Sequence, residues 1–360
     1  KSNQIQILGT NHGPFFIFQK NVKYAKIYTA LKYMIKDIIT KLKDANLLGR
    51  GGAAFPAYLK WEMVKKAKAD TKYIVANGSE GEPATDKDGY IVANYPQDLI
   101  DGIKLALDYI DHSEAYIYLR KDYYKKYKAT LEKMIGKLPI KVFKEKGGYL
   151  SGEETVVCQE IENKMHRPRL KPPFPGQAGI CGYPTLINNI ETFYYAAKIA
   201  QGEYKNTRLF TVSGDVKNPG VYELPLVLTI KDVLKKSKNM PTDDFFVQVG
   251  GGASGDIFLS SELDQPAGGS GAIIVYDLKK TDPYVLMKRW IDFFMEENCD
   301  KCTPCREGTY RLNEMIKNKQ IDKVVLDDLL FVLENTSFCA LGKMVVPPFK
   351  GLSEKILKLK

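Results

Sequence analysis

The chain has 360 residues, 44% of them apolar and 27% charged, with 53 Lys and Arg against 43 Asp and Glu. This length allows two or three domains with cores of their own, and the composition is that of an ordinary globular protein. No apolar stretch reaches the roughly 18–20 residues of a membrane span, and we expect no secretory signal. The formal charge of +10 favours anionic ligands or an acidic partner. Nucleic-acid binding is not expected, because the lysines are scattered and no nucleic-acid-binding motif accompanies them.

The first half of the chain alternates helical and strand patterns. Apolar residues at three-to-four spacing predict a helix within 22–46. Strands and helices are then expected in alternation at 73–76, 97–110, 115–119, 122–136 and 140–143. Such alternation predicts a parallel sheet, which binds ligands at the carboxyl ends of its strands. The loops after Ala76 and Phe143 are therefore the predicted places for a ligand.

These two loops share a composition that suits a phosphorylated sugar. The loop 77–83 and the loop 147–155 each combine glycines, which leave backbone amides bare, with two glutamates. Carboxylates there can bind sugar hydroxyls, although an acidic surface turn is the alternative for either loop alone. The earlier turn 49–56 (GRGGAAFP) matches neither common phosphate-loop pattern, yet its amides lie near Lys60, which with Trp61 is expected to open a helix.

Two further segments complete this half of the chain. The proline-rich, basic stretch 167–175 predicts an ordered arm, because proline cannot continue regular structure. The stretch 188–192 predicts the beginning of a helix with an asparagine as its N-cap.

The pattern changes around residues 203–209 and again near Leu286. A small, separate α+β module is expected between these points, with strands and one helix at 209–214, 221–224, 229–236, 246–249 and 273–276. Beyond Leu286 the chain is expected to be helical. We therefore divide it into three domains, 1–204, 205–283 and 284–360.

Cysteines dominate the last quarter of the chain. Four of the six lie there, at Cys299, Cys302, Cys305 and Cys339. The C-x₂-C-x₂-C run with one distant cysteine favours a [4Fe–4S] cluster, while zinc, which prefers two separated pairs, stays the alternative. Thr309 occupies the position of a fourth cysteine in a two-cluster ferredoxin, so one cluster is expected. Cys158 and Cys181 are expected to be small buried apolar residues.

Several motifs together carry a family resemblance. They are GRGGAAFP with Lys60-Trp61, NGSEGEP, GGYLSGEET, RPRLKPPFP, GYPTLINNIET, CDKCTPCREGT and SFCALG. In these the chain, from about residue 22 to about residue 345, resembles the NADH-binding flavoprotein subunit of respiratory complex I. It is also similar to relatives in NAD-linked hydrogenases, formate dehydrogenases and electron-bifurcating enzymes. The resemblance implies a Rossmann-like α/β FMN domain, a ubiquitin-like β-grasp (SLBB) domain and a C-terminal helical bundle with an iron–sulfur cluster.

The resemblance also implies residue roles. The FMN residues would be Gly49, Arg50, Gly51, Gly52, Lys60, Asn77, Glu80, Asn188, Asn189 and Thr192. The NADH pocket would be shaped by Phe55, Glu82, Glu154, Lys171 and Phe174, with Glu153 between the two ligands. Ser79, Tyr149 and Gly152 would also lie at the cofactors. The four clustered cysteines would ligate the iron.

The implied reaction is hydride transfer from NAD(H) to FMN, followed by single-electron transfer to the cluster. It requires no catalytic side chain, because the cofactors carry the chemistry. Glu154, beside the adenosine ribose, would favour NADH over NADPH. The implied partners are a thioredoxin-like [2Fe–2S] subunit and a further Fe–S subunit. The implied location is cytoplasmic, free or at the cytoplasmic face of a membrane complex.

The chain departs from the family pattern at a few positions. Ser79 replaces the usual Asp, Gly78 the usual Ala, Met63 an aromatic residue and Gly89 the Arg of a K-D-R run. The gap between Cys305 and Cys339 is a few residues shorter than usual. These departures leave one alternative function, an electron-relay or structural subunit that has lost NAD binding.

Overall fold

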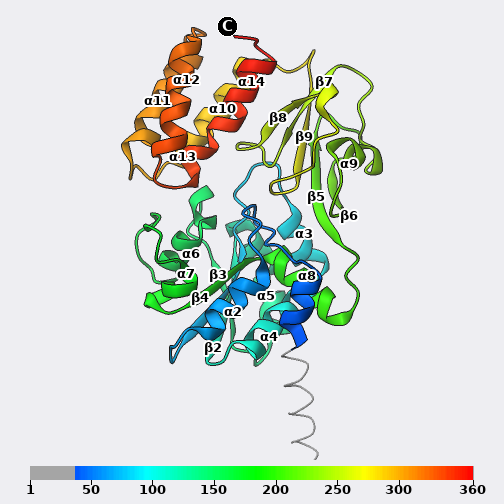
Figure 1. Cartoon of the computed structure of the whole chain (residues 1–360), viewed down its shortest axis with the longest axis vertical. Coiled ribbons are helices and arrows are strands. Elements are labelled where there is room, and N and C mark those ends of the chain that lie inside the picture. Colours follow the sequence, from blue (N-terminus) through cyan, green and yellow to red (C-terminus); the bar gives the residue numbers. More distant parts are fainter. Residues whose placement is uncertain (1–36, 360) are drawn as a thin grey trace, which may run out of the picture.

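The computed structural model describes residues 37–359. Two lobes stack along the long axis of the molecule (Figure 1). One lobe contains a parallel sheet, and the other places a second sheet beside a group of C-terminal helices. Of the helix predicted within 22–46, the part at 37–44 is helical, and 22–36 lie outside the described residues.

The first lobe is built on a four-stranded parallel sheet of order β3-β2-β1-β4. Its strands are β1 (Lys72–Gly78), β2 (Ser113–Leu119), β3 (Ile140–Lys144) and β4 (Thr185–Asn189). The helices of this lobe are α2 (Ala57–Lys66), α3 (Lys87–Asn94), α4 (Pro96–Tyr109), α5 (Lys121–Ile135), α6 (Glu154–Ile161), α7 (Pro175–Ala178) and α8 (Ile190–Gln201). The prediction of alternating strands and helices is confirmed for β1 to β3, α4 and α5.

Strand β4 was not predicted. The predicted beginning of a helix within 188–192 is confirmed, because α8 begins at Ile190, although Asn188 and Asn189 also end a strand. Asn189 does cap this helix, because its side chain accepts from the amide of Glu191. The strand is short, ends in two polar residues and pairs with β1 at the edge of the sheet. Similarly, Lys60 and Trp61 lie inside α2, which begins at Ala57.

Alternate residues of the strands supply the cores on the two faces of this sheet. On one face, Ile74 and Ile117 belong to the large apolar core that also includes residues of α4 and α8. On the other face, Val75 packs with Cys158 of α6. Cys158 is therefore buried as predicted. The prediction for Cys181 is wrong: it is exposed, because it lies in a turn with a left-handed backbone (φ 51°).

The second sheet has five strands of order β6-β5-β9-β7-β8. They are β5 (Thr207–Gly214), β6 (Gly220–Pro225), β7 (Phe245–Val249), β8 (Asp256–Leu259) and β9 (Ala272–Asp277), with α9 (Ile230–Lys236) beside them. Strands β5 and β9 are parallel, and the other pairs are antiparallel. The four predicted strands and the helix are confirmed, and the short β8 was missed. One face packs against α9, and the other packs Phe246 and Tyr276 against the C-terminal helices.

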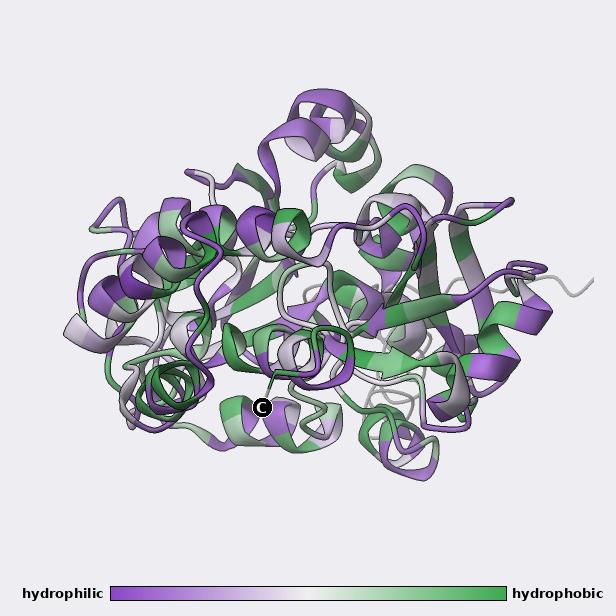
Figure 2. Cartoon of the chain, turned by 90° about the horizontal axis from the view of Figure 1, so that it is seen from above, coloured by the Kyte–Doolittle hydropathy of each residue, from purple (hydrophilic) through white to green (hydrophobic). Residues whose placement is uncertain are grey.

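The C-terminal helices are α10 (Pro283–Glu296), α11 (Thr303–Lys317), α12 (Lys323–Thr336), α13 (Ala340–Met344) and α14 (Val346–Lys355). Hydrophilic and hydrophobic residues mix along the outer helices of the molecule, as amphipathic packing requires (Figure 2). Among residues 37–359, none of the helices combines the length and the apolar character that crossing a membrane requires. The three-part layout confirms the predicted fold class. The domain division at 1–204, 205–283 and 284–360 stays a prediction.

Candidate functional site

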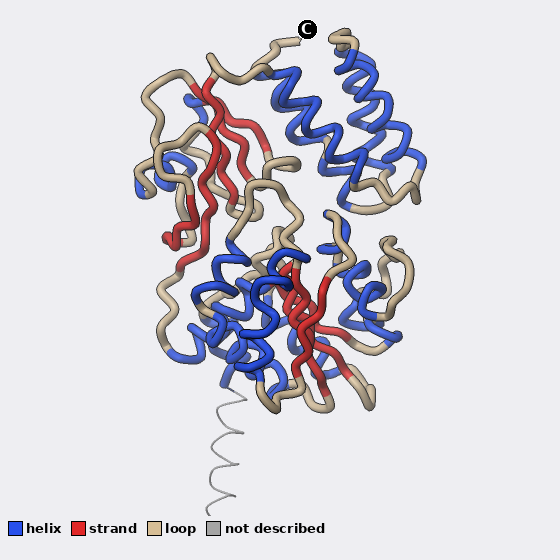
Figure 3. The backbone as a smooth tube through the Cα atoms, turned by 180° about the vertical axis from the view of Figure 1, so that it is seen from behind, coloured by secondary structure: helices blue, strands red, loops and turns tan. Residues whose placement is uncertain are grey.

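The carboxyl ends of the four parallel strands gather the predicted loops at one edge of the first sheet. This edge faces the second sheet and the C-terminal helices (Figure 3). Asn77, at the end of β1, donates from Nδ2 to the carbonyl oxygen of Gly152 at 3.0 Å. The amide of Ser79 donates to Asn77 Oδ1 at 3.1 Å. The loops 77–83 and 147–155 are thereby joined at this edge.

The glycine-rich turn 49–56 lies against the end of β4 and the beginning of α8. The amide of Arg50 donates to Thr192 Oγ1 at 3.0 Å, and Trp61 Nε1 donates to Asn188 Oδ1 at 3.0 Å. Gly52 has a φ of +106° and open space where a Cβ would lie, so only glycine adopts this backbone without strain. The turn therefore offers exposed amides that a phosphate or a flavin ring can approach closely.

The side chain of Arg50 points away from this opening. It is buried, its Nη2 donates to the Tyr204 hydroxyl at 3.1 Å, and its guanidinium lies 5.5 Å from the centre of the Tyr195 ring. Arg50 therefore contributes its backbone amide to the turn, while its side chain holds the turn on α8.

Two lysines and two glutamates connect the turn to the proline-rich arm. Lys171 Nζ lies 2.9 Å from Glu153 Oε1 and 3.1 Å from Glu154 Oε1. Lys60 Nζ approaches Glu154 Oε2 at 3.5 Å. Burial lowers the pKa of Lys171, but the two carboxylates outweigh it and hold the pKa above its ordinary value. Both lysines thereby lie against the Glu154 carboxylate.

Two aromatic side chains stand open beside this charged set. Phe55 is 41% exposed at the end of the turn, and Phe174 is 50% exposed at the end of the arm. Exposed aromatic rings beside charged groups are typical of surfaces that bind planar ligands. The structure thus leaves both predicted nucleotide-binding aromatics available.

Glu80 and Asn189 lie beneath the edge rather than at its opening. Asn189 accepts from Lys87 Nζ at 3.0 Å and donates to Asp88 Oδ2 at 2.6 Å. Lys87 also lies 2.7 Å from Asp88 Oδ1 and 3.2 Å from Glu191 Oε2. Four of these side chains are buried, those of Glu80, Lys87, Asp88 and Glu191. Together with Asn189 and Tyr123 they form what we call the buried ionic network.

Glu80 is held in this network by three donors. It accepts from the amides of Asp88 and Gly89 and from the Tyr123 hydroxyl, the last at 3.0 Å. Burial, followed by the nearby Asp88 carboxylate, raises the pKa of Glu80 to about 7. The network was not predicted. The pair Lys87-Asp88 was visible in a motif, but its burial follows only from the packing of α3 on α8.

Glu82 and Tyr149 contact the other lobe. Glu82 Oε1 accepts from the amides of Ala253 and Ser254, at 2.8 and 2.9 Å, in the loop between β7 and β8. Tyr149 donates from its amide to Glu297 Oε2 at 2.6 Å and from its hydroxyl to Met344 Sδ at 2.8 Å. The loops at the edge are thereby attached to both the second sheet and the cysteine-bearing helices.

The structure shows what surrounds the positions that depart from the family pattern. The Ser79 hydroxyl donates to Glu145 Oε2. A Cβ at Gly89 would lie 2.4 Å from the Tyr123 ring, and the Arg120 guanidinium stacks 4.1 Å from the centre of that ring. Met63 is 40% exposed on α2.

The four clustered cysteines lie at the beginnings of two helices. Cys302 is the N-cap residue of α11, Cys305 lies in its first turn, and Cys339 is the N-cap residue of α13. Cys299 lies in the loop before α11, and none of the four is in a disulfide. Burial, followed by the neighbouring cysteines, raises the pKa of Cys305 to about 12. In the structure as described from 37 to 359, no three His, Cys, Asp or Glu side chains are drawn together closely enough to hold a metal.

The surroundings of the cysteines nevertheless fit a sulfur-ligated cluster. All four pack in or against one apolar core, and four thiols are the donor set that a [4Fe–4S] cluster takes. A Cβ at Gly342 would lie 3.2 Å from Cys305 Cβ and 2.3 Å from Ser337 Oγ, so glycine keeps this space open. Ser337 Oγ is buried without a hydrogen-bond partner among the described residues. Cluster binding would release protons from these thiols.

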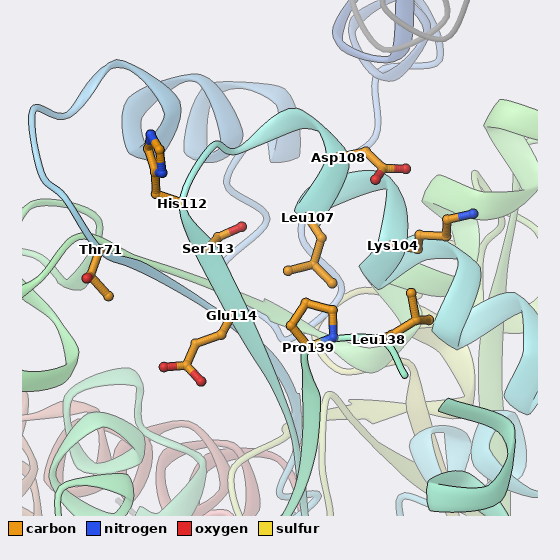
Figure 4. A pocket seen from close by; sticks show the side chains of 9 residues that line it. All are labelled: Thr71, Lys104, Leu107, Asp108, His112, Ser113, Glu114, Leu138 and Pro139. Atoms are coloured by element: carbon orange, nitrogen blue, oxygen red, sulfur yellow. The ribbon is translucent and has the colours of Figure 1, made fainter. Parts of the chain in front are cut away.

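Two cavities lie away from these residues. One, of about 440 Å³, opens at the amino end of the sheet, where Lys104 and Asp108 of α4 stand beside Ser113 and Glu114 of β2 (Figure 4). The other, of about 550 Å³, lies between α2 and α7 and is lined in part by Met63. Neither contains a predicted cofactor residue.

Comparisons with known proteins agree with this arrangement. The Nuo51 FMN-binding domain model matches residues 42–198, the SLBB domain model 209–237, and the NADH-ubiquinone oxidoreductase-F iron-sulfur binding region 285–356. The F subunit of NADH-quinone oxidoreductase from Streptomyces coelicolor is 33% identical over 377 residues, covering 92% of this chain and 84% of that protein. The corresponding protein of Aquifex aeolicus is 34% identical over 365 residues, covering 90% and 85%.

A solved structure resembles the whole arrangement. The crystal structure of an NAD⁺-reducing [NiFe]-hydrogenase in the H₂-reduced state matches with a TM-score of 0.82 and 29% identity. The match covers 88% of this chain but 61% of that one, so this chain spans less than two thirds of the hydrogenase chain.

Proposed function

The chain belongs to the family of the NADH-quinone oxidoreductase F subunits, and on this basis we propose that it oxidises NADH, or reduces NAD⁺ in reverse, within a multi-subunit complex. The observation that carries the proposal is the contact between its two cofactor regions. Tyr149, in the loop beside Gly152, touches Glu297 and Met344 of the cysteine-bearing helices. A flavin at the sheet edge would therefore lie close to the cluster that takes its electrons.

The residues at the edge would bind and orient the cofactors. When bound, FMN supplies the exchange between two-electron hydride chemistry and one-electron transfer. The amides of Gly51 and Gly52 and the Lys60 ammonium would bind its anionic and polar groups, because the amides of Gly49 and Arg50 already donate to Phe55 and Thr192. Asn77 and Gly152 fix the loops around it. Phe55 and Phe174 would hold the adenine of NADH between the turn and the arm. Thr192 anchors the turn through the amide of Arg50, while Asn188 and Asn189 hold α2 and α3 through Trp61 and Lys87.

The charged set at the arm would select NADH. A 2′-phosphate on the adenosine ribose would meet the carboxylates of Glu153 and Glu154, which repel it. Lys60 and Lys171 hold the Glu154 side chain in this position. The four cysteines would hold the [4Fe–4S] cluster, and the apolar core around them would exclude water from it.

The partners and location follow from the same reasoning. We propose a thioredoxin-like [2Fe–2S] subunit and a further Fe–S subunit as partners. The helix α12, which leads toward Cys339, offers a docking surface, since Val324 and Phe331 on it are 71% and 66% exposed. A cytoplasmic location, free or at the cytoplasmic face of a membrane complex, suits the clustered free thiols, which persist in reducing compartments.

An anaerobic titration of the cofactor-loaded chain with NADH tests the function. Loss of the flavin absorbance band, with an iron–sulfur signal in low-temperature EPR, is the expected result. Flavin that stays oxidised in NADH but bleaches with dithionite would contradict NADH oxidation and support the electron-relay alternative. Cys181→Ser, which changes an exposed cysteine away from the cluster, is the matched control and should behave as the unaltered chain.

A further inference from the structure

We propose that Glu145 is a positioning residue of the flavin site, which acts through the Ser79 hydroxyl on the polyhydroxy (ribityl) chain of the cofactor. The inference rests on the proposed FMN site and deepens it. It concerns a glutamate that none of the motifs includes, and it assigns a role to the serine that stands where the family motif has aspartate.

The two residues meet across the end of the middle strand. Ser79 follows β1 and Glu145 follows β3, with β2 between these strands in the sheet. The amide of Glu145 donates to the carbonyl oxygen of Leu119, the last residue of β2, at 3.0 Å. Its side chain then continues across this end, accepting from the amide of Lys121 at 3.3 Å and from the Ser79 hydroxyl. The carboxylate thus reaches the loop after β1 from two strands away.

The carboxylate is buried where an unpaired charge is costly. Glu145 is 4% exposed. Burial raises its pKa, while the bonds from Ser79 and Lys121 oppose that shift. Among residues 37–359, these are the two hydrogen-bond donors to its carboxylate. An ionised carboxylate can accept about four hydrogen bonds, so its negative charge is incompletely neutralised and acts on the neighbouring Ser79.

This arrangement fixes the direction of the Ser79 hydroxyl. A serine hydroxyl has one proton to donate and two lone pairs. Because the proton is directed to Glu145, the oxygen is left as an acceptor. A Cβ at Gly152 would lie 3.7 Å from this oxygen, so the missing side chain of Gly152 leaves room beside it. A ligand hydroxyl placed there would donate to Ser79, as it would to a carboxylate on the loop itself.

The hydrogen bond from Ser79 to Glu145 indicates which ligand group the Ser79 oxygen can bind. A hydroxyl whose proton is engaged by a carboxylate accepts from alcohol groups and repels anions. It therefore suits the uncharged ribityl hydroxyls rather than the phosphate, which the amides of Gly51 and Gly52 and the Lys60 ammonium would bind. The other reading is that the pair only ties the loops after β1 and β3 together, and the experiment separates the two.

The test measures FMN affinity on the full, flavin-free chain by quenching of FMN fluorescence, with thermal unfolding of each flavin-free variant as the folding control. Ser79→Ala and Glu145→Gln should each weaken FMN binding about tenfold. The double variant should bind no worse than about twofold below either single variant, because both remove one interaction. Glu114→Gln, at the opposite end of the sheet and paired with Lys141, should bind FMN normally.

If a single variant folds poorly, moving the carboxylate from position 145 to position 79 provides a second test. Ser79→Asp alone places two carboxylates together and should weaken FMN binding. Ser79→Asp combined with Glu145→Gln returns one carboxylate to the pair and should bind within about threefold of the unaltered chain.

Three results would overturn the inference. They are normal FMN affinity in Glu145→Gln, additive losses in the double variant, or no gain from adding Glu145→Gln to Ser79→Asp. Lower thermal stability with unchanged FMN affinity would assign the pair to loop structure alone, which also overturns it. If the unaltered chain does not bind FMN, the proposed function itself fails, and this outcome is distinct from all the others.

Discussion

The sheet edge and the cysteine region solve the problem of holding a cofactor in opposite ways. At the edge, the predicted residues come from a turn, two strand-end loops, a helix and an arm, and several of their side chains contact protein rather than solvent. Glu80 lies in the buried ionic network, and Glu82 is bound by the loop after β7. In the cysteine region, four thiols come from two short stretches at the beginnings of α11 and α13. We therefore expect a change at the edge to be compensated from a neighbouring strand more readily than a change of a cysteine.

The largest effect is expected from removing a cysteine, which changes the cysteine region and leaves the sheet edge intact. Cys302→Ser should abolish the iron–sulfur EPR signal and lower the rate of electron transfer to an external one-electron acceptor at least about 100-fold, since even indirect changes cost up to that factor. NADH should still bleach the flavin. Iron analysis and EPR on the purified variant measure this, with Cys181→Ser as the control. A variant that kept a normal cluster would mean that Cys302 is not a ligand.

The next largest effect is expected from removing the positive charge at the centre of the buried ionic network. The Lys87 side chain is 4% exposed and neutralises Asp88 and Glu191. Lys87→Met should lower the free energy of unfolding by about 3–5 kcal/mol, because it leaves buried carboxylates unpaired. Denaturant unfolding measures the change. The matched control is Lys141→Met, which breaks the more exposed pair with Glu114 and should cost less than about 1 kcal/mol.

How much of the molecule the sequence could predict differs between the same two regions. The cysteine spacing is local, so four residues in two motifs were enough to predict a cluster. At the edge, the strand alternation located the loops, and glycine with glutamate indicated a ligand. The partners of those residues could not be predicted. Lys87 meets Glu191 only because α3 packs on α8, and Ser79 meets Glu145 only because of the order of the strands. Strand β4 was missed for the same reason, since its pairing with β1 is a tertiary contact.

A pH effect of intermediate size sharpens the description of the buried ionic network. Burial and the Asp88 carboxylate raise the pKa of Glu80 to about 7, from an ordinary value near 4.5. The folded state therefore holds this proton more tightly than the unfolded chain. The stabilisation is complete below about pH 4.5 and is lost as the pH rises toward 7. Glu80→Gln should flatten this part of the stability curve by about 1–3 kcal/mol. A curve as steep as that of the unaltered chain would mean that Glu80 is ionised in the folded state.

A smaller effect tests the charged set at the arm. Glu154→Gln keeps the shape of the side chain and removes the charge that would face an NADPH 2′-phosphate. Lys60 and Lys171 then lie unopposed by Glu154 and should attract that phosphate. The ratio of kcat/KM for NADPH to that for NADH should rise about tenfold. Steady-state kinetics with both nucleotides measure it, and an unchanged ratio would exclude Glu154 from selecting the nucleotide.

The smallest effect is expected from a change of Ser337, a buried residue beside the cysteines. Ser337 is 7% exposed, and its Oγ has no hydrogen-bond partner among the described residues. It lies beside the space at Gly342, which also adjoins Cys305. A hydroxyl there would donate to a cysteine sulfur and stabilise the reduced, more negative cluster, because hydrogen bonds to the sulfurs help set the cluster potential.

Ser337→Ala should therefore lower the midpoint potential of the cluster by about 20–60 mV, the equivalent of one weak hydrogen bond in a one-electron couple. Iron content and flavin bleaching should not change. The matched control is Thr336→Ala, since the neighbouring Thr336 hydroxyl donates to the Val332 carbonyl oxygen at 2.6 Å and faces away from the cysteines on the exposed side of α12. Equal potentials in the two variants, measured by EPR-monitored redox titration, would show that the Ser337 hydroxyl does not reach the cluster, and the cysteine region would then depend on its motif alone.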